Sequence, residues 1–174
     1  MKLTTKVILM MGALTMAACT NAGKWGGGAG DGAFGPNAAG NSGLIAGSAS
    51  DPASTAYFQQ AVGDRVTFEV DQSSLTAVGR ATLDGQATWL LTNADYTAII
   101  EGHADEQGTR EYNIALGNRR ADAARSYLVS KGVPSSRMQI VSYGKERPIE
   151  ICSEEACYAK NRRAVTVLAG GLTG

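Results

Sequence analysis

Apolar and polar positions alternate in several short segments after residue 50, which is typical of strands that bury one face. In the first of these, Val66, Phe68 and Val70 alternate with polar residues, and the later segments have β-branched or aliphatic centres. Four segments are predicted to be strands: residues 66–70, 96–102, 138–143 and 164–169.

Between these strands, apolar residues recur at helical spacing. Two long helices are predicted over 75–93 and 110–131, and a short one over 54–62. The second long helix is followed by Gly132 and Pro134, which are typical of a helix end. The resulting order β-α-β-α-β-β predicts an α+β fold, a two-layer sandwich with the helices packed on one face of a mixed four-stranded sheet.

The first 18 residues have the pattern of an export signal. Lys2 and Lys6 precede an apolar run that ends at Ala18. That run is too short to cross a bilayer core, which needs about 20 helical residues. We therefore expect 1–18 to be a signal peptide. Met16-Ala17-Ala18-Cys19 resembles the bacterial lipobox, which implies that Cys19 carries palmitate and other acyl chains.

Residues 19–50 are expected to form a flexible tether, followed by one folded domain over 51–174. Ten glycines fall between positions 23 and 47, and such a segment buries too little to offset its chain entropy.

Residues 30–35 match the G-x-G-x-x-G fingerprint, but no strand precedes them and no helix follows, so no nucleotide or other cofactor is expected. Residue 20 is Thr and not Asp. By the same resemblance, lipoproteins without Asp after the cysteine go to the outer membrane, so that location is expected.

Composition excludes several classes of function. The sequence has 16 basic and 16 acidic residues, which argues against nucleic-acid binding by bulk charge. Its single histidine, His103, excludes His-rich zinc sites, so no metal is expected. No nucleophile-elbow motif is present, and although carboxylates near His103 could serve as an acid/base pair, the favoured prediction is no catalysis.

Cys152 and Cys157 lie in a polar segment between two predicted strands. In the oxidising compartment of an exported protein, a disulfide between them is favoured over two free thiols. The bond would close a short loop, so its effect on stability should be modest.

The predicted helix over 110–131 places Asn113 and Arg120 on one side, because residues seven apart differ by only about 20° around the axis. The same side is otherwise apolar and should face the sheet, whereas Arg119 and Arg125 should face water. A buried arginine needs an anionic partner, and Asp105 is the nearest candidate. The two residues either brace each other or form a pocket for a ligand that carries both charges.

Several segments together closely resemble the OmpA-like peptidoglycan-binding domain: residues 101–117, 119–121, 142–148 and 161–165. The resemblance implies binding of meso-diaminopimelate in the peptidoglycan stem peptide. Asp105 would hold its ammonium group and Arg120 its carboxylate, and Asn113 would add hydrogen bonds.

The resemblance also places Asp71 in this pocket, and Arg163 is a weaker candidate. The family usually has Phe-Asp-Phe-Asp where this chain has Phe68-Glu69-Val70-Asp71, so one wall of the pocket departs from the family pattern. An opposed carboxylate and guanidinium suit a zwitterion, and no bond has to be broken.

The implied protein is a non-enzymatic outer-membrane lipoprotein that holds the cell wall within the Tol system and supports envelope integrity and cell division. TolB is the implied partner, and TolA is a second candidate. Two alternatives are an OmpA-like lipoprotein of another envelope or secretion assembly and a cell-wall hydrolase.

Overall fold

The computed structural model of the protein describes residues 45–170. The expected signal peptide, Cys19 and most of the expected tether lie outside these residues. At the start of the described segment, a series of turns leads into the domain, where the indole N–H of Trp89 donates to the Pro52 carbonyl at 2.7 Å and the Tyr96 hydroxyl donates to the Ala53 carbonyl at 3.0 Å.

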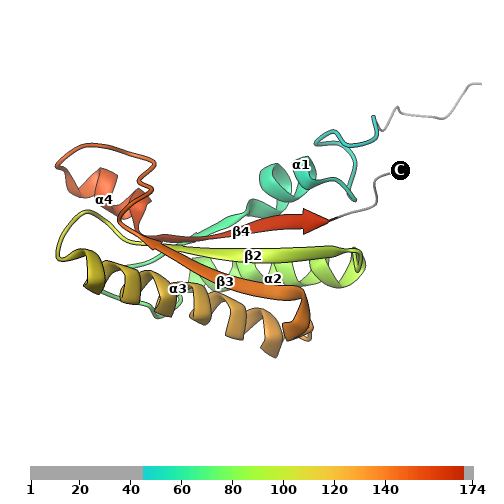
Figure 1. The fold of residues 1–174 in the computed structure, drawn as a ribbon. Coiled ribbons are helices and arrows are strands. Elements are labelled where there is room, and N and C mark those ends of the chain that lie inside the picture. The colour runs from blue at the N-terminus through green and yellow to red at the C-terminus, as the bar shows by residue number, and fades with distance from the viewer. Residues whose placement is uncertain (1–44, 171–174) are drawn as a thin grey trace, which may run out of the picture. The chain divides into compact units, whose positions relative to one another are not determined.

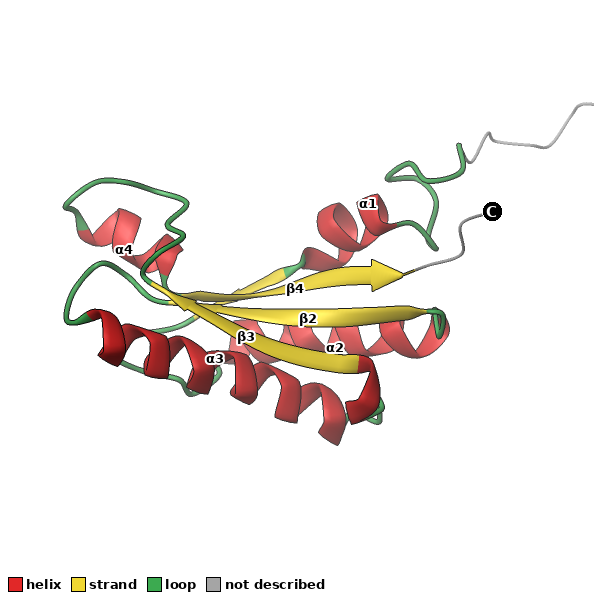
Figure 2. Cartoon of the chain, viewed as in Figure 1, coloured by secondary structure: helices red, strands yellow, loops and turns green. Residues whose placement is uncertain are grey.

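Four strands form one mixed sheet in the order β1-β4-β2-β3 (Figures 1 and 2). β2 and β3 are parallel, and β4 is antiparallel to both β1 and β2. The strands are β1 (Arg65–Thr67), β2 (Tyr96–His103), β3 (Met138–Gly144) and β4 (Arg163–Gly170). The expected α+β sandwich is confirmed.

The two long helices, α2 (Ala77–Thr92) and α3 (Arg110–Ser130), cover the same face of the sheet (Figure 1). The core between these layers includes Phe58, Leu83, Leu90, Ile100 and Leu128, all at most 1% exposed. The remaining helical segments are short: α1 (Thr55–Tyr57), the π-helical turn η1 (Phe58–Gly63), the 3-10 turn η2 (Ser135–Arg137) and α4 (Glu155–Asn161).

The ends of α3 follow the sequence signals. The Thr109 hydroxyl accepts the Tyr112 N–H and caps the first turn. At the other end, Gly132 adopts a left-handed backbone with φ 99°, and the Val133 N–H donates to the Leu128 carbonyl at 3.1 Å. This arrangement satisfies the terminal carbonyls and ends the helix where the glycine predicted it.

Four elements differ from the expectation: β1, η1, η2 and α4. The helix predicted over 54–62 is π-helical over most of its length, and the 3-10 turn η2 was not predicted. The first strand ends at Thr67 and not at residue 70, because its partner strand β4 begins only at Arg163, which pairs with Thr67. Beyond this pair, one more backbone hydrogen bond joins the Phe68 N–H to the Arg162 carbonyl at 2.9 Å. Helix α4 was not expected, because its seven residues are too few to show a helical apolar period.

Helix α3 approaches β2 and β3 very closely at two glycines. A Cβ added to Gly102 on β2 would lie 1.8 Å from the Gly117 carbonyl oxygen on α3. A Cβ added to Gly117 would lie 2.4 Å from the Ser142 hydroxyl on β3. This contact lies just before the end of β2, so it sets the height of α3 over the residues that follow the strand.

We expect Gly102→Ala to lower the free energy of unfolding by about 3 kcal/mol, the upper end of the usual cost of overpacking. The cause is the clash with the helix backbone, which only a shift of α3 can relieve. Urea denaturation of the variant measures the effect. Gly85→Ala is the control, because its Cβ meets only Val62 at 3.5 Å and alanine favours a helix; equal midpoints for the two variants would contradict the close-contact interpretation.

Candidate ligand-binding site

A hollow of about 240 Å³ opens where three segments meet at one end of the sheet. The segments are the turn after β1, the loop after β2 and the first turns of α3. The residues that line the hollow are Val70, Asp71, Asp105, Gln107, Gly108, Tyr112, Asn113 and Leu116. Three of the four residues predicted for the site, Asp71, Asp105 and Asn113, therefore share one hollow.

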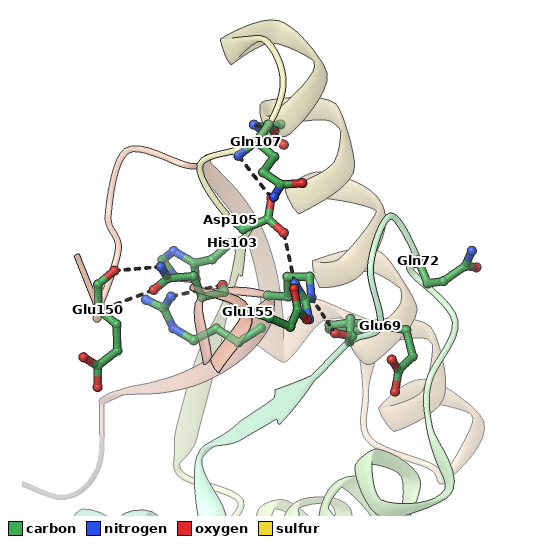
Figure 3. Close-up of polar contacts among 12 residues, drawn as sticks. Glu69, Gln72, His103, Asp105, Gln107, Glu150 and Glu155 are labelled. Atoms are coloured by element: carbon green, nitrogen blue, oxygen red, sulfur yellow. Dashed lines mark hydrogen bonds and ion pairs between the residues drawn. The ribbon is translucent and has the colours of Figure 1, made fainter. Parts of the chain in front are cut away.

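Asp105 lies two residues beyond the end of β2 and is 7% exposed. One carboxylate oxygen, Oδ1, accepts the Gln107 N–H at 3.3 Å, and the other, Oδ2, is 3.2 Å from Nη1 of Arg162. Figure 3 shows Asp105 between these two contacts. Its position is thus fixed from both sides.

Asn113 is buried on the first turn of α3 and donates through Nδ2 to the Gln107 carbonyl at 2.7 Å. The bond attaches the loop after β2 to the helix. The amide therefore shapes the wall of the hollow, in addition to lining it.

Asp71 also lines the hollow, from the turn after β1. Its backbone has φ 56°, a left-handed conformation that Asp tolerates better than most residues. The Tyr112 hydroxyl donates to Asp71 Oδ1, and this hydrogen bond raises the pKa of Tyr112. Tyr112 thereby connects the turn that carries Asp71 to helix α3.

Arg120 is fully buried and does not line the hollow. Its guanidinium donates to three backbone carbonyls: Nε to Gln72 at 2.8 Å, Nη1 to His103 at 2.8 Å and Nη2 to Glu69 at 3.3 Å. The side chain of Gln72 points away from the site in Figure 3. Arg120 thus joins the turn that carries Asp71 to the end of β2.

Arg120 is close enough to Asp105 and Asp71 for their charges to affect its pKa, but it forms a salt bridge with neither of them. Burial lowers the pKa of Arg120, the charge of Asp105 opposes this shift, the charge of Arg162 adds to it and the charge of Asp71 opposes it, with a net pKa of about 10. The direct Asp105–Arg120 brace considered from the sequence is not formed, because Asp105 pairs with Arg162 instead.

Arg162 is the residue that sequence reasoning missed. Neighbouring residues in extended chain point to opposite sides, and Arg163 points elsewhere, donating to the carbonyls of Asn161 at 3.3 Å and Arg147 at 3.1 Å. The neighbouring pair of arginines was visible in the sequence, but which of them faces Asp105 depends on the fold.

Two other arginines of α3 were expected to face water, and only one of them does. Arg119 is exposed, as expected. Arg125 was expected to face water but is half-buried, with a long contact of 3.5 Å from Nη2 to the Ser135 carbonyl.

His103 is 1% exposed, and neither of its ring nitrogens has a hydrogen-bond partner. The ring lies 5.6 Å from that of Tyr143, and Glu101 Oε2 lies 3.6 Å from Nε2. Burial, followed by the charges of Arg163 and Arg147, lowers the pKa of His103 to about 4. The imidazole is therefore neutral at physiological pH.

The low pKa of His103 predicts acid sensitivity. The unfolded chain takes up this proton near pH 6.5 but the folded chain only near pH 4, so stability is full above pH 6.5 and falls as the pH drops toward 4. We expect this group to account for about 3 kcal/mol of that loss. Urea titrations between pH 4 and 7 of wild type and His103→Phe measure it. The variant should lose less stability over this range; identical slopes would contradict the assignment.

Cys152 and Cys157 form a disulfide with a Cα–Cα distance of 6.1 Å, as expected. Within residues 45–170, no group of three His, Cys, Asp or Glu side chains is placed to hold a metal ion. Over the same residues, no helix is both long and apolar enough to cross a membrane.

Comparison with known proteins agrees with this fold. Residues 67–162 match the sequence model of the OmpA family, which covers the β1–α4 region around the hollow. The chain belongs to the OmpA family.

Its relatives include the peptidoglycan-associated lipoproteins of Rhizobium meliloti and Agrobacterium fabrum. The first is 56% identical over 135 residues, which cover 78% of this chain and 76% of the relative. The second is 47% identical over 164 residues, which cover 94% and 87%. These names describe wall-associated lipoproteins and not enzymes, which bears out the expectation of a non-catalytic protein.

Solved structures support the same fold. The crystal structure of the peptidoglycan-associated lipoprotein from Burkholderia pseudomallei is 36% identical, with a TM-score of 0.63 over 68% of this chain and 100% of that one. The C-terminal domain of Helicobacter pylori MotB shares the fold at a TM-score of 0.58 and 19% identity, covering 62% of this chain and 85% of that one.

Proposed function

We propose that the protein binds peptidoglycan non-covalently through the hollow and connects the outer membrane to the cell wall. The observation that carries this proposal is the pair of carboxylates, Asp71 and Asp105, on the walls of the hollow with the Arg120 guanidinium buried behind them. The names of the relatives, which associate them with peptidoglycan, support it.

The ligand group that suits this arrangement is the free end of meso-diaminopimelate, which carries an ammonium and a carboxylate. Asp105 takes the ammonium, and Asp71 adds a second negative charge to the lining of the hollow. The ligand carboxylate lies on the side of Arg120, whose guanidinium is buried behind the hollow and attracts the carboxylate by its charge rather than by direct contact. Asn113 adds an amide that can bond either group.

Co-sedimentation with purified sacculi tests this function. The protein should pellet with sacculi, free diaminopimelate should release it, and no soluble wall fragments should appear. Release of fragments would instead support a cell-wall hydrolase. Failure to pellet at physiological salt would contradict wall binding.

The proposed attachment to the outer membrane is through acyl chains on Cys19, because the lipobox-like sequence precedes a Gly-rich segment of about 30 residues that can span roughly 30 Å. Its domain then faces the periplasm. Cys19→Ser should abolish incorporation of labelled palmitate and leave the protein soluble in the periplasm after cell fractionation. Continued acylation of this variant would contradict the anchor.

The proposed cellular role is within the Tol–Pal system, with TolB as partner and TolA as a second candidate, in support of envelope integrity and cell division. The relatives' shared name supports this role. The alternative is a lipoprotein of another envelope or secretion assembly. Affinity purification after cross-linking in cells distinguishes them, since recovery of TolB supports the first and recovery of only secretion components the second.

A further inference from the structure

We propose that Arg162 and Glu155 position Asp105 for its ligand, and that the Cys152–Cys157 disulfide holds Glu155 in place for this task. This inference rests on the proposed function of the hollow. It assigns a role in wall binding to a loop outside the hollow and makes that binding depend on the oxidation state of two cysteines.

Arg162 connects three segments that are far apart in the sequence. It is 3% exposed and lies 3.2 Å through Nη1 from Asp105 Oδ2. Through Nε it donates to the Phe68 carbonyl at 3.2 Å, and through Nη2 it contacts the Glu155 carboxylate. The turn before Asp71, the loop after β2 and helix α4 therefore converge on one guanidinium (Figure 3).

This contact decides how Asp105 faces the hollow. Because Arg162 occupies Oδ2 and the Gln107 N–H reaches Oδ1, the carboxylate cannot rotate without losing both contacts. Preorganised charges bind a ligand more tightly because no ordering cost remains at the moment of binding.

The charge of Glu155 determines the net charge of the cluster that contains Asp105. One cation lies between two carboxylates, so the cluster of Asp105, Arg162 and Glu155 carries a net charge of about −1 at neutral pH. Without the Glu155 charge, the guanidinium would neutralise Asp105 alone. A ligand ammonium would then meet a cluster with no net charge.

The disulfide keeps Glu155 beside Arg162. Glu155 is the first residue of α4 and lies between the two bonded cysteines. A helix of seven residues is too short to be stable alone, and no side chain caps its first turn. Figure 2 shows α4 and its loop at the same end of the sheet as the start of α3, where the hollow opens.

A double-mutant cycle tests the coupling. The protein is purified in detergent as the full mature chain, and titration calorimetry measures the affinity of a diaminopimelate-containing stem peptide. Glu155→Gln and the double replacement Cys152→Ser with Cys157→Ser should each weaken binding about fivefold or more, and combining all three should add little further loss. Glu154→Gln is the matched control; its side chain makes no capping bond and it should bind as wild type does.

If the disulfide only stabilises the fold, the result differs. The affinity losses of Glu155→Gln and of the double cysteine replacement then multiply in the combined variant, or only the melting temperature falls. Either outcome would overturn the inference, as would wild-type affinity in Glu155→Gln. Arg162→Lys keeps the charge but not the three-directional contact, so it should bind weakly while still folding. If the oxidised wild type fails to bind the peptide at all, the proposed function itself is wrong.

Discussion

Replacing Asp105 by asparagine should reduce peptidoglycan binding about 30-fold or more. The change keeps the size of the side chain and its acceptor for the Gln107 N–H, but removes the charge that faces the ligand ammonium. Truncating one partner of a partly buried charge pair costs on the order of 2–5 kcal/mol of binding, and about 1.4 kcal/mol corresponds to a factor of ten.

The measurement combines co-sedimentation with sacculi and a thermal melt of the same preparation. Asp105→Asn should stay in the supernatant while it melts close to wild type, because Arg162 retains Glu155 and the Phe68 carbonyl as partners. Asp122→Asn, which changes an exposed acid on α3, is the control for a general loss of negative charge. Normal pelleting of Asp105→Asn would remove this residue from the site.

Arg120→Ala should destabilise the fold by about 3–5 kcal/mol, since it removes three hydrogen bonds from a charged group and leaves buried carbonyls without partners. Binding should be lost as well, because the turn that carries Asp71 is no longer fixed to the end of β2. The sequence left two alternatives for this residue, a brace to Asp105, which predicts a loss of stability, or a ligand pocket, which predicts a loss of binding. The structure predicts that both decline together.

Urea denaturation and wall binding of Arg120→Ala and Arg120→Lys check this expectation. Lysine keeps the charge but cannot reach three carbonyls in fixed directions, so its stability should lie between wild type and alanine. Arg119→Ala should unfold at nearly the wild-type midpoint. An Arg120→Ala protein as stable as wild type would show that the three carbonyl contacts contribute little.

Much of the fold follows from local patterns. Gly132 fixed the end of α3, and the 100° turn per residue placed Asn113 and Arg120 on the buried side with Leu116 and Leu128. Alternation and short apolar runs gave the four strands, because each strand buries only one face against the helices. These signals depend on neighbours a few residues apart, so they can be read directly from the chain.

The parts that could not be predicted depend on long-range contacts. Asp105 and Arg162 are 57 positions apart, and only the pairing of β4 with β2 brings them together. The partners of Arg120 are backbone carbonyls, which carry no signature in the sequence. Helix α4 begins inside the loop closed by the disulfide and contacts Arg162 through Glu155, and its seven residues are too few to show a periodic apolar face.

The central claim is that the hollow recognises both charges at the free end of diaminopimelate. It is tested most directly by titrating the mature protein with two stem peptides that differ only at this residue, one with meso-diaminopimelate and one with lysine, which has the ammonium but lacks the carboxylate. The account predicts that the diaminopimelate peptide binds at least about tenfold more tightly, equivalent to about 1.4 kcal/mol of attraction between its carboxylate and the buried charge of Arg120. Equal affinity for the two peptides would contradict it.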